Sequence, residues 1–163
     1  MEQTDFKALR LTQNYRQTIH AQPEKIFPLL CPVSEAQWLD GWQYQMIFSE
    51  SGRVEQGAVF RTPGLDEPDT DWVVTRHDPS AHKVEFIRIT PFSRTCLLNI
   101  SVLSQDETTS QVDISYTYTG LSPAGNDYIV NLSEADFITS MKFWEESMNH
   151  FLKSGHKLER SAF

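Results

Sequence analysis

Apolar and polar residues alternate along the middle of the chain in a succession of short segments, which predicts a series of β-strands. From Trp42 to Phe48, every second residue is aromatic or Met. Turn-forming stretches such as Asp78-Pro79 and Pro91-Phe92-Ser93 separate the segments that follow. Together these segments predict a six-strand antiparallel meander over residues 42–48, 54–62, 72–77, 83–90, 95–103 and 111–120.

One strand and two short helices are expected before the meander. The strand covers Leu11 to Ala21, and the first helix starts at Pro23, because proline suits the first helical turn. We expect Pro32 to end that helix. The hydroxyl of Ser34 then caps a second helix, with Gln37 reciprocating three residues later, and this helix stops near 40–41.

The C-terminal part of the chain predicts one long amphipathic helix. It begins at Ser133 or nearer Asn126, and Gly155 ends it. Its apolar residues recur at helical spacing on one stripe, which consists of Val130, Phe137, Met141, Trp144, Met148, Phe151 and Leu152.

These elements predict an α+β fold. The apolar face of the meander needs a cover, and only the terminal helix is long enough to provide it. A twisted sheet of about seven strands would wrap around that helix and leave a hollow between them. We expect a single domain over residues 1–163 with its core over about 11–155.

Charge and composition exclude several classes of protein. The 163 residues include 22 acidic residues against 14 Lys and Arg, a net charge of −8, which disfavours binding to nucleic acid and to anionic lipid. The nearly apolar run 26–33 is far too short to insert into a membrane, and the first ten residues lack the apolar core of a secretory signal. Cys31 and Cys96 have no metal-type spacing, so we expect reduced thiols in a cytoplasmic protein.

Four stretches resemble one known superfamily in sequence and order. They are residues 21–30, 35–42, 70–74 and 151–155. The chain is similar to the START and birch-pollen-allergen superfamily, also called SRPBCC or polyketide-cyclase-like, which has a helix-grip fold. This resemblance implies an apolar cavity that holds lipids, polyketides, hormones or aromatic metabolites. Its members include cyclases, transfer proteins and activators of a chaperone ATPase, so the fold leaves the function open.

Strand parity predicts which residues face the cavity. A loop over 49–53 would set Phe48 opposite Val54. At Asp78, a four-residue turn would pair His77 with His82 and put Trp72 on the other face, so we favour an odd-length turn, which gathers the apolar residues. The expected inner face consists of Tyr44, Met46, Phe60, Trp72, Val74, Phe86, Leu98, Ile100, Ile114 and Tyr116, opposed by Phe137, Met141 and Trp144 of the helix. Such residues equally suit plain core packing.

Two arginines, Arg76 and Arg88, fall among these positions. Each either lies outward or at the rim, or faces inward and needs an anion as its partner. Parity places Arg88 opposite Cys96 on a face without a carboxylate. The hypothesis is therefore a ligand with one carboxylate or enolate end, held by Arg88 with help from Tyr116.

Other candidates for chemistry are weaker. His77 and His82 lack a third metal ligand, and the acid-rich loop over 63–71 lacks the spacing of a calcium loop, which predicts a solvated segment. Glu35 is interpreted as serving the helix dipole. No metal and no cofactor are expected.

The sequence therefore predicts binding of a small hydrophobic or aromatic metabolite between the sheet and the last helix, by a monomer or homodimer. An alternative is a cyclase, aromatase or dehydratase that uses the same cavity, and another is a partner of a chaperone ATPase. Alternating strand directions bring loops 63–71, 91–93 and 121–132 to one end, where we expect the cavity mouth. Leu65, Phe92 and Tyr128 are the apolar residues available at this mouth.

Overall fold

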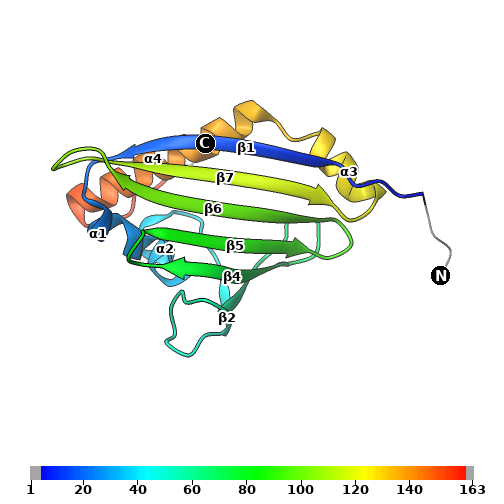
Figure 1. The fold of residues 1–163 in the computed structure, drawn as a ribbon, viewed down its shortest axis with the longest axis horizontal. Helices are drawn as coiled ribbons and strands as arrows, with labels where there is room; N and C mark the ends of the chain where they lie inside the picture. Colours follow the sequence, from blue (N-terminus) through cyan, green and yellow to red (C-terminus); the bar gives the residue numbers. More distant parts are fainter. Residues whose placement is uncertain (1–4, 161–163) are drawn as a thin grey trace.

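The computed structural model describes residues 5–160 and has the predicted α+β architecture (Figure 1). Its seven strands form one antiparallel sheet in the order β1-β7-β6-β5-β4-β3-β2. The strands are β1 (Arg10–Ile19), β2 (Gln45–Phe48), β3 (Val59–Thr62), β4 (Thr70–Asp78), β5 (Lys83–Thr90), β6 (Arg94–Ser104) and β7 (Ser110–Gly120). The helical segments are α1 (Pro23–Ile26), the 3-10 turn η1 (Phe27–Leu29), α2 (Pro32–Trp38), α3 (Pro123–Val130) and α4 (Glu134–Ser154).

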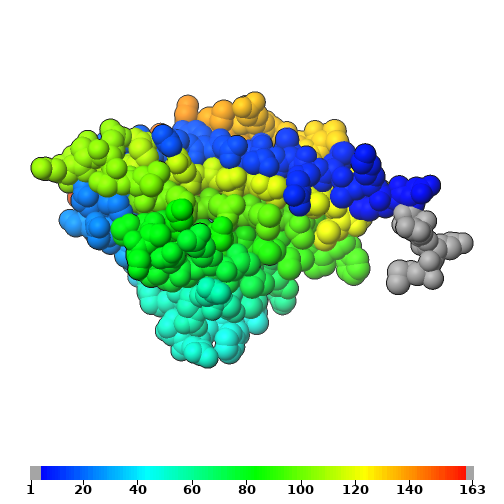
Figure 2. Space-filling model, viewed as in Figure 1, coloured from blue at the N-terminus to red at the C-terminus, as the bar shows by residue number. Residues whose placement is uncertain are grey.

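The helices lie behind the sheet in Figure 1, and the sheet presents its outer face to the viewer. Figure 2 shows that this outer face is a continuous surface, from which the cyan segment around β2 projects. Within residues 5–160, none of the helices combines the length and hydrophobicity that a bilayer span requires.

Helix α4 covers the inner face of the sheet, as the helical stripe predicts. Phe137, Met141, Trp144 and Met148 are all buried in the same apolar core as the inner strand residues. Polar contacts hold α4 against β1. The Gln17 side-chain amide donates to the Met141 carbonyl oxygen at 3.0 Å, and the Asn149 amide donates to the Thr18 carbonyl oxygen at 3.0 Å.

The predicted role of Pro32 and the placement of Val130 on the last helix were wrong, whereas the predicted start of that helix at Ser133 is correct. Pro32 starts α2 instead of ending the preceding helix, because the unbonded first turn tolerates a residue without N–H. Ser34 therefore lies inside α2, and its hydroxyl accepts a hydrogen bond from the Arg53 guanidinium at 2.7 Å. Val130 belongs to α3 and is 69% exposed, because Ser133 caps a separate α4 by accepting from the Asp136 N–H.

The hairpin between β2 and β3 has a longer loop than predicted. Phe48 pairs with Val59 rather than Val54, Met46 pairs with Phe60, and the register shifts between Met46 and Phe48. The Glu55 carboxylate accepts hydrogen bonds from Ser49, Glu50 and Ser51, which stabilises the extended loop. The shared face of Met46 and Phe60 survives because the change of register keeps the parity.

The hairpin between β4 and β5 corrects the predicted turn. Asp78 pairs with Lys83, so the loop has four residues rather than an odd number. A β-bulge between Val74 and Arg76 reverses the parity within β4, which keeps Trp72 and Val74 on the inner face opposite Arg88 and Phe86. The prediction that these apolar residues share one face was correct, but the cause is the β-bulge and not an odd-length turn.

Candidate functional site

A small cavity of about 80 Å³ lies between the sheet, α2 and α4. Seven of the residues predicted to face the cavity line it. The complete lining is Pro32, Glu35, Leu39, Trp42, Phe60, Trp72, Phe86, Leu98, Ile100, Tyr116 and Trp144.

Aromatic rings form one wall of this inner cavity. Trp72 stacks on Phe60 with ring centroids 5.1 Å apart, and it meets Phe86 edge-on at 5.8 Å and Trp42 at 6.0 Å. Two further predicted residues, Tyr44 and Met46, pack against the core without lining this cavity. The wall is therefore rigid and apolar on the side of β3, β4 and β5.

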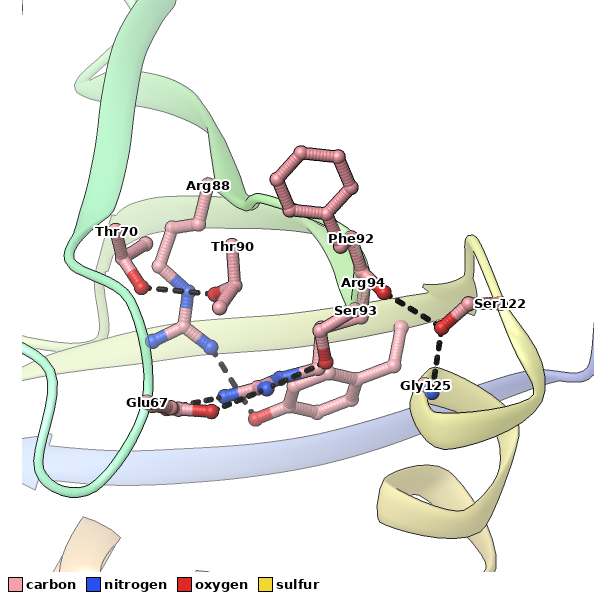
Figure 3. A network of polar contacts seen from close by, with 10 residues as sticks. Glu67, Thr70, Arg88, Thr90, Phe92, Ser93, Arg94, Ser122 and Gly125 are labelled. Atoms are coloured by element: carbon pink, nitrogen blue, oxygen red, sulfur yellow. Dashed lines mark hydrogen bonds and ion pairs between the residues drawn. The ribbon is translucent and has the colours of Figure 1, made fainter.

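Arg88 lies on the inner side of β5, opposite Cys96 as predicted. Its guanidinium lies over the rings of Trp72 and Tyr116, at 5.0 and 4.9 Å from their centroids. It donates one hydrogen bond, to the Tyr118 hydroxyl at 3.2 Å (Figure 3). Among residues 5–160, no carboxylate forms an ion pair with Arg88. Aromatic faces therefore surround the Arg88 charge, and the Glu67 carboxylate lines the same hollow without forming an ion pair with it.

Two larger hollows adjoin this position. A polar hollow of about 220 Å³ is lined by Arg88 and Trp72 together with residues of the loop over 63–67, and it includes Tyr118 and Tyr128. An open hollow of about 580 Å³ lies between β7 and the start of α4. It includes Phe137 and Met141, the remaining two predicted helix residues, and shares Tyr116 with the inner cavity. Arg88 itself lines only the polar hollow, and the aromatic residues that its guanidinium contacts, Trp72 and Tyr116, line the inner cavity as well.

The acid-rich loop is anchored rather than merely solvated. Buried Arg94 forms a bidentate ion pair with Glu67, at 2.8 and 2.9 Å (Figure 3). Its guanidinium also lies 3.4 Å from the centroid of the Tyr128 ring. Hydrogen bonding to Arg94 lowers the pKa of Glu67. This pair brings the 63–71 loop, the start of β6 and α3 together at one end of the sheet, where Leu65 and Phe92 remain exposed.

Glu35 is the polar residue of the inner cavity that sequence reasoning missed. Its carboxyl group comes from α2 and makes no side-chain hydrogen bond within residues 5–160. Burial raises the pKa of Glu35 to about 8. Helical spacing could have revealed it, because Pro32 and Glu35 lie three residues apart on one face of α2 and both line the cavity.

Tyr116 and Tyr118 supply further polar groups near Arg88. Burial raises the pKa of both phenols, so their hydroxyl groups remain protonated at neutral pH. Each hydroxyl can donate to or accept from a ligand oxygen.

Arg76 lies outside this arrangement. It pairs with Glu85 on the outer face, because the bulge in β4 turns it away from the cavity, and it forms an ion pair with Asp78 at 3.2 Å. His77 and His82 both contact the Phe27 ring, at 5.3 and 5.8 Å, instead of pairing with each other. Over residues 5–160, His, Cys, Asp and Glu side chains form no group of three that could hold a metal ion.

Comparison of the fold with solved structures gives a consistent group of proteins. Norcoclaurine synthase from Thalictrum flavum aligns with a TM-score of 0.68 at 12% identity, covering 93% of this chain and 98% of that one. The Zhui aromatase/cyclase from Streptomyces sp. R1128 aligns with a TM-score of 0.65 at 10% identity, covering 92% and 100%. Ara h 8.0201 aligns with a TM-score of 0.60 at 11% identity, covering 90% and 99%. No family model and no curated protein matches the sequence.

These neighbours are helix-grip proteins, and the chain has their fold. The resemblance drawn from the sequence is thereby confirmed at the level of the fold. At 10–12% identity, the comparison carries no information about a particular ligand or reaction.

Proposed function

We propose that this protein binds a small aromatic or hydrophobic metabolite that carries one carboxylate or enolate group. The observation that carries this proposal is the Arg88 guanidinium, which lies between the Trp72 and Tyr116 rings without a carboxylate partner among the described residues. Arginine stays protonated at any working pH, so this position is a permanent positive charge at the polar hollow, next to aromatic residues that line the inner cavity. A ligand anion would supply the missing partner, with the Tyr116 and Tyr118 hydroxyl groups beside it.

The space around Arg88 supports a ligand that is larger than the inner cavity. The inner cavity of about 80 Å³ is smaller than a typical ligand pocket, which occupies roughly 300–1,000 Å³. The neighbouring hollows of about 220 and 580 Å³ provide the remaining room. A rotation of the Tyr116 side chain, which lines the cavity and the larger hollow, would join the two spaces.

The experiment compares matched acids and esters. Isothermal titration calorimetry would measure binding of 2-naphthoate and of its methyl ester to the protein and to Arg88→Leu. We expect the protein to prefer the acid, and Arg88→Leu to lose about 1.5–3 kcal/mol of that preference, the contribution of a charge-assisted hydrogen bond. Arg76→Leu is the matched control, because it removes an arginine from the outer face. Equal affinity for acid and ester in the unmodified protein would refute the proposal.

A second candidate is an enzyme of the cyclase, aromatase or dehydratase type. Glu35 favours it, because a carboxyl group with a pKa of about 8 can exchange a proton with a substrate near neutral pH. Incubation with an aromatic polyketide, followed by mass spectrometry of the products, tests this candidate. Turnover should fall at least about tenfold in Glu35→Gln if the carboxyl group transfers a proton.

A further inference from the structure

The indole N–H of Trp144 differs from those of the other three tryptophans. Trp38, Trp42 and Trp72 each donate one hydrogen bond, to the Leu29 carbonyl oxygen at 3.0 Å, the Pro32 carbonyl oxygen at 2.9 Å and the Thr62 hydroxyl at 2.9 Å. Trp144 is 8% exposed, and its Nε1 has no acceptor within residues 5–160. A buried donor without a partner costs roughly 1–3 kcal/mol, so native proteins seldom leave one without a reason.

Trp144 and Glu35 line the same inner cavity. The Glu35 carboxyl group also lacks a side-chain partner among the described residues, although apolar and aromatic side chains surround it. The buried Trp144 donor therefore lacks an acceptor, and Glu35, which lines the same space of about 80 Å³, makes no side-chain hydrogen bond among the described residues. This space is too small for a whole aromatic ligand, but it has room for one polar substituent or a few water molecules.

The chemistry of these two groups selects the substituent. An indole N–H only donates, so it needs an acceptor, whereas a carboxyl group accepts in either protonation state. A ketone or an ether could accept from Trp144 and from the Glu35 carboxyl group, which is protonated at pH 7, but it could not donate to the second Glu35 oxygen. An ammonium group would satisfy Glu35 but could not accept from Trp144. A hydroxyl group does both.

We propose that Glu35 and Trp144 form a subsite for a hydroxyl substituent of the ligand. This inference rests on the proposed function, since the acid group of the same ligand would bind at Arg88. The predicted ligand class is thereby narrowed to hydroxy-substituted aromatic acids. Tyr116 connects the two ends, because its phenol lies within electrostatic range of both Arg88 and Glu35 and lines the cavity as well as the open hollow.

Four probes separate this subsite from the Arg88 site. They are 6-hydroxy-2-naphthoate, 2-naphthoate and the methyl esters of both, and their affinities are measured by calorimetry at pH 7. The acid-to-ester ratio reports on Arg88, and the ratio of hydroxylated to unsubstituted compound reports on Glu35 and Trp144. We expect the hydroxylated acid to bind about tenfold more tightly than 2-naphthoate, the effect of satisfying one buried polar group.

Variants assign the hydroxyl preference to the two side chains. Glu35→Leu should bring the hydroxyl ratio to about one while the acid-to-ester ratio stays unchanged. Trp144→Phe keeps a ring but removes the N–H, and it should lower the same ratio. Glu146→Gln is the matched control, because Glu146 is exposed on the outward side of α4 and should leave both ratios unchanged.

Each of the other possible outcomes contradicts the hydroxyl subsite, the Arg88 proposal or both. Equal affinity for hydroxylated and unsubstituted acids would mean that water alone occupies the subsite, and it would overturn the inference while leaving the Arg88 proposal intact. A hydroxyl preference that persists in both Glu35→Leu and Trp144→Phe would overturn it as well. Loss of acid selectivity with a retained hydroxyl preference would overturn the proposed function instead, and no binding by any probe would overturn both.

Discussion

Two combinations of arginine and glutamate, Arg94 with Glu67 and Arg88 with Glu35, are arranged in opposite ways. At the end of the sheet, Arg94 and Glu67 form a bidentate ion pair, and both charges are satisfied within the protein. In the interior, Arg88 and Glu35 do not pair with each other or with another charged group of the described chain. The pKa of Glu67 is lowered by hydrogen bonding to Arg94, whereas burial raises that of Glu35.

This difference indicates that the paired residues stabilise the fold and that the unpaired residues serve ligand binding. A paired arginine and glutamate stabilise the positions of the segments that carry them, and here they join a loop, a strand and α3. Unpaired polar groups in an apolar cavity lower the stability of the free protein, and a complementary ligand can compensate for them. We therefore assign the outer pair to the architecture and the inner groups to binding.

The largest expected change in stability comes from breaking the ion pair between Arg94 and Glu67. Arg94→Met leaves Glu67 without its partner, and we expect the free energy of unfolding in urea to fall by about 3 kcal/mol. The double variant Arg94→Met/Glu67→Gln should recover part of this loss, because it also removes the unpaired charge. A loss below about 0.5 kcal/mol in the single variant would place this pair with ordinary surface ion pairs.

A smaller effect of opposite sign is expected from Glu35→Leu. Replacing an unpaired, half-buried carboxyl group with an apolar side chain should raise the free energy of unfolding by about 1 kcal/mol at pH 8. Thermal and urea unfolding would measure it. Destabilisation at pH 8 would indicate that the carboxyl group has a partner in the folded protein.

The pH dependence should distinguish the two glutamates. The folded protein keeps the Glu35 proton up to about pH 8, whereas the usual pKa is 4.5, so unfolding releases a proton between these values. Stability should therefore fall as pH rises through this window, by at most about 1.4 kcal/mol per pH unit, and Glu35→Gln should remove the slope. Glu67 acts in the opposite direction, because its lowered pKa gives stability that is lost as the solution becomes more acidic than its usual pKa.

The smallest expected effect is that of Arg88→Leu on stability. It removes contacts with two aromatic rings, each worth about 0.5–1 kcal/mol, and at the same time relieves the desolvation of a charge. We expect a net change within about 1 kcal/mol of zero in urea unfolding. A loss as large as that of Arg94→Met would show that Arg88 is structural.

The fold could be predicted well because the spacing of apolar residues along each strand and helix determines which face is buried. Alternation placed Phe86, Leu98 and Tyr116 on one face, and helical spacing placed Met141 and Trp144 opposite them, as the structure has them. These features depend on neighbours along the same element, so parity and spacing are enough to find them.

The polar part of the site depends on contacts that periodicity does not encode. The side on which Arg76 lies is decided by a single bulge in β4. The partnership of Arg94 with Glu67 crosses 27 positions of sequence and requires the loop to fold back over the sheet. Glu35 was interpreted from its own helix alone, because the aromatic side chains that bury it come from other elements.

The contacts between β1 and α4 also constrain the order of events during synthesis. Hydrogen bonds such as those from Gln17 to Met141 and from Asn149 to Thr18 join positions 124 and 131 residues apart. Neighbouring strands of the meander can pair as soon as they leave the ribosome, but their apolar face stays uncovered until α4 has been translated. Such late closure slows folding, and we expect the growing chain to be prone to aggregation until the last helix emerges.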